Sequence, residues 1–381
     1  MQLTAEQAAR YQEFKAFAND HIEPFAAEWD RDQQLSDGMI AALAERGYLG
    51  CILPQECGGK GWDTVTHGLL VEALGRASSS AALFLTVQTM VTTTLLKWGT
   101  ADQKSKWLRP LATGKMLGAF AITEPGAGSA TGSLTTEFTR GSGDQLILNG
   151  TKKWISCAQT AGVFLVFGKL QQQPLACLVP KEASGLKIEP IADLIGFRAG
   201  GLAEVHFNNV KIPAADVIGK PGFALSHVAP VGLHYGRICT ACSGLGLSRA
   251  CFEESISYAS TRRIGDTTVG ENGMIRSLIA RMGTDLEAGT LLCRDACRAA
   301  DEHSPEAFEK ALMAKYFTST AAVKAASDAV QIRGASGVHG SAAVSRYYRD
   351  AKILEIIEGT TQIHEQLLGK MFVNQANRLR S

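Results

Sequence analysis

The sequence lacks long blocks of one charge and long uninterrupted apolar segments. Its 38 basic and 37 acidic residues nearly cancel, which leaves a formal net charge of +1. Without such a block, we expect no electrostatic binding to nucleic acid or to an anionic membrane. No apolar run approaches the roughly 18–20 residues that span a bilayer. The N-terminus shows no basic patch followed by an apolar stretch, so we expect neither a membrane segment nor a signal peptide.

A complete set of metal ligands is also missing. The nine cysteines are scattered, mostly through apolar segments such as 238–242. The pairs Cys239/Cys242 and Cys293/Cys297 have helical spacing, and no histidine or second cysteine pair completes a tetrahedral set. We therefore predict no metal site. Buried free thiols of this kind are typical of a reducing compartment, so we expect a cytoplasmic protein.

The length of 381 residues is too great for one compact core, and the texture of the sequence changes twice. Residues 1–115 show helical spacing of apolar residues, residues 116–228 show short β-rich runs between turn residues, and residues 229–381 are helical again. We predict an α+β multidomain protein with an N-terminal helical domain, a central β domain and a C-terminal helical bundle. Within the β domain, Asn149-Gly150 predicts a hairpin turn between two short strands.

Two segments of the β domain have the composition of a ligand site. In the first, an apolar strand ends at Thr123 and a glycine-rich loop follows up to Ser129. Gly126 and Gly128 allow close approach of the backbone to a ligand, although the spacing is not that of a Walker or dinucleotide motif. In the second, 153–156, a tryptophan on a strand can stack on an aromatic ring system or simply pack on the sheet.

Two further segments suit an anionic group. Arg262 and Arg263 lie at the junction of two helical stretches, where paired guanidinium groups can bind a pyrophosphate. The glycine-rich break at 331–337 lets backbone amides approach a phosphate. Taken alone, each segment also fits an ordinary helix end.

A single carboxylate stands at a helix break near the C-terminus. Glu358 follows two β-branched apolar residues and precedes Gly359 and Thr360, with helical stretches on both sides. Thr360 is a candidate N-cap of the second helix. A carboxylate held against apolar neighbours is one whose pKa desolvation can raise, as a general base requires. A solvated surface glutamate is the alternative for this segment alone.

Taken in this order, these motifs resemble those of the acyl-CoA dehydrogenase family, over essentially the whole chain. The segment 120–129 resembles the flavin signature, and 154–156 resembles the strand that contacts the isoalloxazine ring. The segments 195–198 and 205–213 resemble the exit of the β domain, 331–337 the loop that meets the ADP moiety of a neighbouring subunit's FAD, 349–352 the lead-in to the catalytic segment, and 358–360 the catalytic Glu-Gly-Thr.

The resemblance implies a fold with a C-terminal four-helix bundle and FAD between that bundle and the β domain. It also implies α,β-dehydrogenation of an acyl thioester, in which Glu358 removes the α-proton and flavin N5 takes the β-hydride. An electron-transferring flavoprotein is the implied acceptor, and a homotetramer or homodimer the implied assembly. Direct contact with FAD is implied for the residues that match the family's motifs: Phe120, Ile122, Thr123, Gly128, Ser129, Trp154, Ile155, Ser156, Arg262, Gln331, Gly334, Thr360 and Gln362.

Substrate contacts are implied for Ser129, Arg237 and Gly359. In some members the base lies on an earlier helix, directly before a common arginine. That arginine resembles Arg237 here, and its predecessor Gly236 has no side chain, which favours Glu358 as the base.

The sequence departs from the family pattern at several positions. Ile357 stands where tyrosine is usual, Ala130 where aspartate often follows the flavin loop, and Gly273 where a glutamine is expected. These departures leave open the same chemistry on an acyl-carrier protein, a flavin-dependent monooxygenase of the same fold, and a scaffold without FAD. Polar residues 86, 88 and 92–94 in the N-terminal helices predict a short or polar acyl group.

Overall fold

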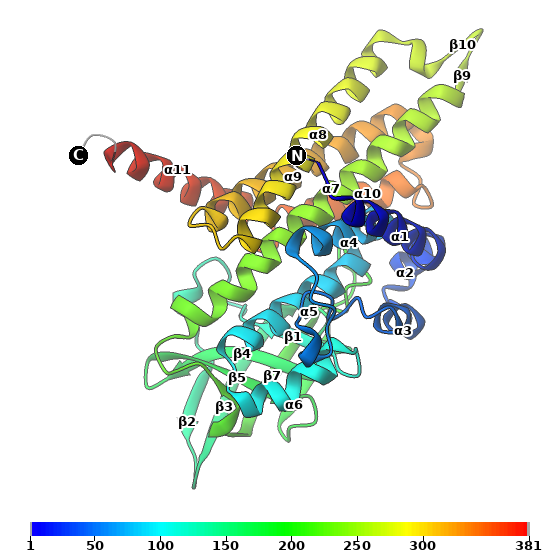
Figure 1. The fold of residues 1–381 in the computed structure, drawn as a ribbon. Helices are drawn as coiled ribbons and strands as arrows, with labels where there is room; N and C mark the ends of the chain where they lie inside the picture. Colours follow the sequence, from blue (N-terminus) through cyan, green and yellow to red (C-terminus); the bar gives the residue numbers. More distant parts are fainter. Residues whose placement is uncertain (1, 379–381) are drawn as a thin grey trace.

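The computed structural model describes residues 2–378 of the chain. Figure 1 shows helices at the N-terminal side, a β-sheet in the middle of the sequence and long helices after it. The last N-terminal helix ends at Ala112, the first strand begins at Gly118, and the long helices begin at Ala229. The predicted α+β fold with its three parts is confirmed.

The N-terminal helices begin at side chains that accept hydrogen bonds from the first turn. Thr4 and Thr100 form capping boxes with Gln7 and Gln103, and Asp63 accepts a hydrogen bond from the amide of Thr66. Such caps satisfy amides that have no partner within the helix. The α-helices of this part are α1 (Ala5–His21), α2 (Ala26–Asp32), α3 (Asp37–Glu45), α4 (Thr64–Ala77), α5 (Ser79–Trp98) and α6 (Ala101–Ala112).

Helix α5 is a core helix. By length and composition it is the one helix of the described residues apolar enough to cross a membrane, with a mean hydropathy of 1.3 over an 18-residue window. The expectation that no apolar segment approaches this length is therefore wrong for α5. Because 94% of that window is buried inside the protein, its apolar side chains are already covered by other elements.

The β domain is one eight-stranded sheet. Its strand order is β6-β7-β3-β2-β4-β5-β8, and β1 pairs in parallel with β4 beside this path. The strands are β1 (Gly118–Ala121), β2 (Glu137–Arg140), β3 (Gln145–Ile155), β4 (Val163–Leu170), β5 (Gln173–Pro180), β6 (Leu186–Pro190), β7 (Ala203–Pro213) and β8 (Val217–Ile218).

The hairpin predicted at Asn149-Gly150 is wrong. These residues lie inside the continuous strand β3, which pairs with β2 on one side and with β7 on the other. The pairing with β7 shifts register between Leu148 and Gly150, which is a β-bulge. A Cβ at Gly150 would lie 2.7 Å from Oγ1 of Thr136, so the glycine serves close strand packing.

The C-terminal part is a bundle in which α7, α8 and α9 pack on one another and α10 packs on α7 and α9. Helix α11 packs on α9 and then extends away from the rest of the molecule (red in Figure 1). These helices are α7 (Ala229–Thr261), α8 (Gly273–Asp301), α9 (Ala307–Arg333), α10 (Ala343–Leu354) and α11 (Thr361–Arg378). A short hairpin of β9 (Arg263–Ile264) and β10 (Thr267–Thr268) follows α7.

Two segments singled out in the sequence join the β domain to α10. The carboxylate of Asp350 accepts a hydrogen bond of 2.7 Å from the amide of Phe197, and Arg349 donates one of 3.1 Å to the carbonyl of Ile195. A Cβ at Gly196 would lie 2.3 Å from the carbonyl oxygen of Arg349, so the two backbones meet closely. This contact fixes the helix that leads directly into Glu358.

Candidate active site

Glu358 lies in the turn between α10 and α11, as the helix break predicted. Its φ is 55° and that of Gly359 is 96°, so two successive residues adopt left-handed backbone conformations. A left-handed glutamate is uncommon and costs conformational free energy, so surrounding contacts must hold the turn. The predicted N-cap is confirmed, because Oγ1 of Thr360 accepts a hydrogen bond of 3.4 Å from the amide of Ile363.

The carboxylate of Glu358 points into the protein. Its Oε2 atom is buried and has no hydrogen-bond partner within the described residues. Burial raises the pKa of Glu358 to about 7, against the opposing effect of the positive charges on Arg237 and Lys315. A carboxylate without a partner and with a pKa near neutrality has the properties of a general base.

Helix α7 brings Glu358 and strand β1 to neighbouring positions. A Cβ at Gly236 would lie 2.3 Å from Oε2 of Glu358 and 3.0 Å from the sulfur of Met90 on α5. One helical turn earlier, a Cβ at Gly232 would lie 2.5 Å from the ring of Phe120. Residues four apart share a helix face, so Glu358 and Phe120 lie along the same side of α7.

Three cationic or donor side chains surround the carbonyl oxygens of the Glu358 turn. Arg237 and His364 contact the carbonyl oxygen of Glu358 at 3.4 Å and 3.1 Å, and Lys315 donates a hydrogen bond of 2.6 Å to that of Gly359. Lys315 and His364 were not predicted from the sequence. A lysine within the apolar α9 segment was a signal, but only the fold shows that its side chain is buried.

A buried ion pair shapes the glycine-rich loop after β1. Lys152 of β3 and Glu124 lie 2.7 Å apart with side chains 0% and 2% exposed. Burial alone would raise the pKa of Glu124, but hydrogen bonds from Lys152, Thr135 and Thr136 outweigh it and lower the pKa to about 2. Lys152 also donates to the carbonyl of Ile122, so β3 holds both the end of β1 and the loop.

The predicted flavin-contacting residues of the β domain come together at this junction. The amide of Lys153 donates a hydrogen bond of 2.9 Å to the carbonyl of Thr123, which places Trp154 beside the loop. Trp154 is 50% exposed and has a φ of 60°. The predicted residues of the two strands lie on either side of this bond: Phe120, Ile122 and Thr123 in or after β1, and Trp154, Ile155 and Ser156 in or after β3.

The junction fits a flat ligand such as the isoalloxazine ring. The loop that ends in Gly128 and Ser129 is exposed, and a Cβ at Gly126 or at Gly128 would meet no atom within 4 Å. The chain therefore leaves room beside this backbone. A half-exposed indole and open backbone at the end of a strand are features that a ring system and its polar substituents can contact.

Of the remaining predicted FAD contacts, Thr360 and Gln362 directly follow the Glu358 turn, whereas the other three lie far from it. Arg262 caps the C-terminal end of α7, about 26 residues and so about 39 Å along the helix from Gly236. Gln331 and Gly334 end α9 at the same place, because Tyr258, one turn before Arg262, donates a hydrogen bond of 3.4 Å to the carbonyl of Arg333. The chain therefore presents its predicted FAD contacts at two separated places.

The polar residues of α5 do not offer free hydroxyl donors. The hydroxyls of Thr86, Thr92, Thr93 and Thr94 each donate to the carbonyl four residues earlier, at 2.7–2.9 Å. Gln88 donates to the carbonyl of Leu111 and accepts from the amide of Gly118. Because these groups are satisfied within the protein, they no longer support a polar acyl group.

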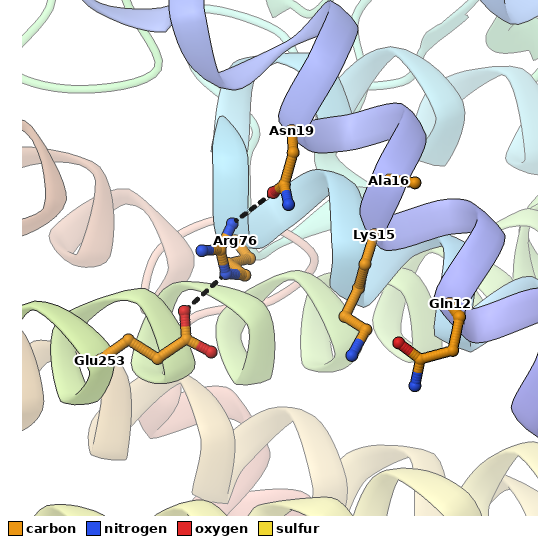
Figure 2. A pocket seen from close by; sticks show the side chains of 6 residues that line it. All are labelled: Gln12, Lys15, Ala16, Asn19, Arg76 and Glu253. Atoms are coloured by element: carbon orange, nitrogen blue, oxygen red, sulfur yellow. Dashed lines mark hydrogen bonds and ion pairs between the residues drawn. The ribbon is translucent and has the colours of Figure 1, made fainter.

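A separate hollow of about 380 Å³ lies between α1, α4 and α7 (Figure 2). Its charged side chains include Arg76, which donates to Glu253 at 2.7 Å and to Asn19 at 3.0 Å. The hollow contains none of the predicted site residues, and its paired charges are those of a helix interface. Within residues 2–378, no group of three or more histidine, cysteine, aspartate or glutamate residues is placed to hold a metal ion.

The cysteines are free, as predicted, and eight of the nine are buried. Burial raises the pKa of Cys51, Cys157 and Cys251. None of these thiols is therefore a reactive thiolate near neutral pH.

Comparison with known proteins places the chain in a family. Residues 4–115 match the acyl-CoA dehydrogenase N-terminal domain, residues 119–210 the middle domain and residues 226–372 the C-terminal domain. The chain is 33% identical to the mitochondrial short-chain specific acyl-CoA dehydrogenase of Mus musculus over 358 residues, covering 92% of this chain and 86% of that protein.

Solved structures show the same fold. Butyryl-CoA dehydrogenase from Megasphaera elsdenii has a TM-score of 0.94 with 27% identity, covering 98% of this chain and 99% of that one. FkbI, described as acting in biosynthesis of the methoxymalonyl extender unit of the Fk520 polyketide, has a TM-score of 0.86 with 28% identity, covering 96% and 99%.

The chain belongs to the acyl-CoA dehydrogenase family. It is a flavin oxidoreductase that acts on CH–CH groups, and its cofactor is FAD. The resemblance drawn from the sequence motifs is confirmed, together with the class of enzyme and the cofactor.

Proposed function

We propose that this protein dehydrogenates a short acyl thioester between its α and β carbons, with Glu358 as the base. The observation that carries the proposal is the Glu358 carboxylate itself. It is buried, its Oε2 atom lacks a hydrogen-bond partner within residues 2–378, and its pKa is raised to about 7. It lies on the same side of α7 as Phe120 of strand β1, which is one of the predicted flavin contacts.

Glu358 takes the α-proton of the thioester onto its carboxylate. The chemistry that FAD supplies when bound is acceptance of the β-hydrogen in the form of a hydride. The residues fitted to hold it are those at the β1–β3 junction, with Trp154 and the open backbone of the 126–129 loop. The backbone amide of Glu358 is suited to stabilise charge that develops on the thioester oxygen. Arg237 and Gly359 flank this position, which supports their assignment to substrate binding.

A short acyl group is supported by the relatives. The mouse enzyme is named as short-chain specific and the M. elsdenii enzyme as a butyryl-CoA dehydrogenase. Met90 and the ring of Phe120 are apolar neighbours of the Glu358 side of α7, which suits an apolar acyl chain.

The alternative is the same chemistry on an acyl-carrier protein. FkbI is described as acting in the biosynthesis of a polyketide extender unit, and the similarity to it supports this alternative as a role in secondary metabolism. The departures at Ala130 and Gly273 from the family's motifs are consistent with it. A monooxygenase of the same fold is disfavoured, because the Glu-Gly-Thr segment and its buried carboxylate are retained.

We also propose a homotetramer or homodimer in the cytoplasm, with an electron-transferring flavoprotein as acceptor. The separation of Arg262, Gln331 and Gly334 from the Glu358 side supports the assembly, because a second copy can bring these residues to the first copy's cofactor. Light scattering at several protein concentrations measures the assembly. A monomer that retains FAD would contradict it.

The experiment that tests the function is an anaerobic visible spectrum of the purified protein before and after addition of short acyl thioesters. Matched coenzyme A and carrier-protein thioesters of the same acyl group identify the carrier. Bleaching of the flavin bands supports the proposal. Glu358→Gln should bind FAD and fail to bleach, and bleaching at the wild-type rate would remove Glu358 as the base.

A further inference from the structure

We propose that Lys315 and His364 are positioning residues for Glu358, which hold the Glu358–Gly359 turn by its two carbonyl oxygens and so keep the carboxylate over Gly236. The inference rests on the proposed role of Glu358 as the base. Neither residue belongs to the predicted catalytic, cofactor-binding or substrate-binding residues.

The turn needs external support. Glu358 and Gly359 both have positive φ, at 55° and 96°, and the carbonyl oxygens of both point to side chains from other helices. A Cβ at Gly359 would lie 2.9 Å from Nε2 of His364, so the imidazole packs directly against the turn. A conformation of this kind persists when its surroundings determine it.

Lys315 provides the stronger of the two contacts. Its side chain is buried in α9, and its Nζ donates a hydrogen bond of 2.6 Å to the carbonyl of Gly359. A buried ammonium is costly unless it is bound to an acceptor or a counter-charge. Burial lowers the pKa of Lys315 to about 8. Among the groups that oppose this shift, the negative charge of Glu358 has the largest effect. Lys315 therefore interacts with the turn through a hydrogen bond and with the carboxylate of Glu358 through its charge.

His364 provides the second contact from the first turn of α11. Its Nε2 lies 3.1 Å from the carbonyl oxygen of Glu358, so Nε2 carries the proton and donates it. The side chain is buried, and burial lowers its pKa to about 4, so the imidazole is neutral at physiological pH. His364 therefore acts on the turn through its geometry, and Lys315 through both geometry and charge.

The charged and titratable groups that face Glu358 come from three helices. Arg237 lies on α7, Lys315 on α9 and His364 on α11, while α5 contributes the apolar Met90. Cys239 of α7 also interacts with Glu358, but burial raises its thiol pKa well above the usual value, so it stays neutral. Among the groups that change charge near neutrality, Lys315 is thus the one whose removal should alter the ionisation of Glu358.

The test compares Lys315→Met with Lys315→Arg in the FAD-loaded enzyme. The readouts are the flavin content, the KM and the limiting rate of flavin reduction by an acyl thioester between pH 5.5 and 9. We expect Lys315→Met to keep FAD and to lose about tenfold or more in limiting rate. The acidic limb of the pH–rate profile, where the rate rises with pH, should move upward by about one pH unit, because the positive charge that lowers the pKa of Glu358 is removed. Lys315→Arg, which keeps the charge, should restore the position of the limb. A wild-type rate and limb in Lys315→Met would overturn the role of Lys315.

A second pair keeps the inference testable if Lys315→Met does not fold. His364→Leu removes the donor, and His364→Gln keeps one at a similar reach. We expect His364→Leu to lower the limiting rate with KM and the acidic limb unchanged, and His364→Gln to recover the rate. Equal, wild-type rates in both variants would overturn the role of His364.

Glu358→Gln separates failure of this inference from failure of the proposed function. An inactive Glu358→Gln together with wild-type behaviour of the Lys315 and His364 variants would refute the positioning role alone. A Glu358→Gln enzyme that reduces its flavin at the wild-type rate would refute the proposed base, and the positioning role with it.

Discussion

The carboxylate of Glu358 lies directly over Gly236, in the space that a side chain at position 236 would fill. A Cβ at Gly236 would come within 2.3 Å of Oε2 and 2.7 Å of Cδ of Glu358. Such a distance is far below contact between real atoms, so the two positions on α7 and in the α10–α11 turn exclude each other. Only one side chain can occupy this space, either that of Glu358 or one at position 236.

A side chain at position 236 should therefore displace the base. We expect Gly236→Val to fold and to bind FAD, because the obstructing atoms are the mobile end of the Glu358 side chain. The rate of flavin reduction should fall roughly 100-fold, the usual effect of misplacing a reacting group by about 1 Å. Stopped-flow reduction by an acyl thioester measures this. Gly283→Ala, whose Cβ would meet Phe252 at an ordinary 3.4 Å, is the control and should stay at the wild-type rate.

The same relationship predicts that the base can be moved to α7. Glu358→Gly should abolish general-base catalysis, which contributes about 10²–10⁴-fold, and should relieve the backbone strain of a φ of 55°. Adding Gly236→Glu should restore about tenfold or more of the lost rate, since its carboxylate enters the vacated space. No recovery in the double variant, despite bound FAD, would show that the two positions are not equivalent for the chemistry.

The pH dependence of flavin reduction should report the ionisation of Glu358. Only the carboxylate form accepts a proton, and burial raises the pKa of Glu358 to about 7. The rate should therefore rise with pH, by about tenfold per pH unit well below 7, and level off above it. Stopped-flow measurements from pH 5.5 to 9 test this with a substrate that does not ionise in the range. A rate that is flat down to pH 5.5 would mean that Glu358 is not buried in the functional enzyme.

The order of helices, sheet and helices could be predicted because it follows from hydrophobic periodicity. The strands β4, β5 and β7 lie where alternating or apolar runs between turn residues placed them. The long helices α7, α8 and α9 likewise cover the predicted segments. The hairpin turn predicted from Asn149-Gly150 was wrong, because the same dipeptide can also form a β-bulge inside a strand that is paired on both sides.

The site could be predicted only in part, since burial is a property of the fold. Glu358 stood out through its helix break and neighbouring glycine, which are local features. The contacts of Lys315 and His364 join α9 and α11 to the turn, and although a lysine within the apolar α9 segment is a local signal, no local pattern shows which atoms it contacts. The threonines of α5 were misread for a different reason, because their hydroxyls donate to carbonyl oxygens within their own helix.

The ion pair between Glu124 and Lys152 should be important for stability. Lys152→Met leaves the buried carboxylate of Glu124 without its counter-charge, which typically costs about 3–5 kcal/mol. Urea denaturation of the FAD-free protein measures the free energy of unfolding. Asp32→Asn, which breaks the exposed Arg31–Asp32 pair, should cost only about 0–1 kcal/mol. Equal effects of the two substitutions would contradict the burial of the inner pair.

The acid stability of the protein should depend on the same carboxylate. The pKa of Glu124 is lowered from 4.5 to about 2, so its stabilising effect is fully present above pH 4.5 and is lost as the pH falls toward 2. Glu124→Gln removes the ionisation, so its free energy of unfolding should depend less on pH between 4.5 and 2 than that of the wild type. Urea midpoints measured across this range test the sign.

Arg262 should contribute to FAD binding only in the assembled protein. Its side chain is exposed and forms no hydrogen bond or ion pair within residues 2–378, whereas the guanidinium of Arg263 donates to the carbonyl of Asp266 at 2.8 Å. A guanidinium bound to a phosphate is a charge-assisted contact, so Arg262→Ala should weaken FAD retention about 10- to 100-fold. The ratio of flavin to protein after dilution and gel filtration measures this, with Arg263→Ala as the control that keeps its FAD.

In the Arg262→Ala molecules that retain FAD, the rate of flavin reduction should equal that of the wild type. The reason is distance, because Arg262 lies about 39 Å along α7 from Gly236. Full flavin retention in Arg262→Ala at every concentration would place the adenine end of the cofactor elsewhere.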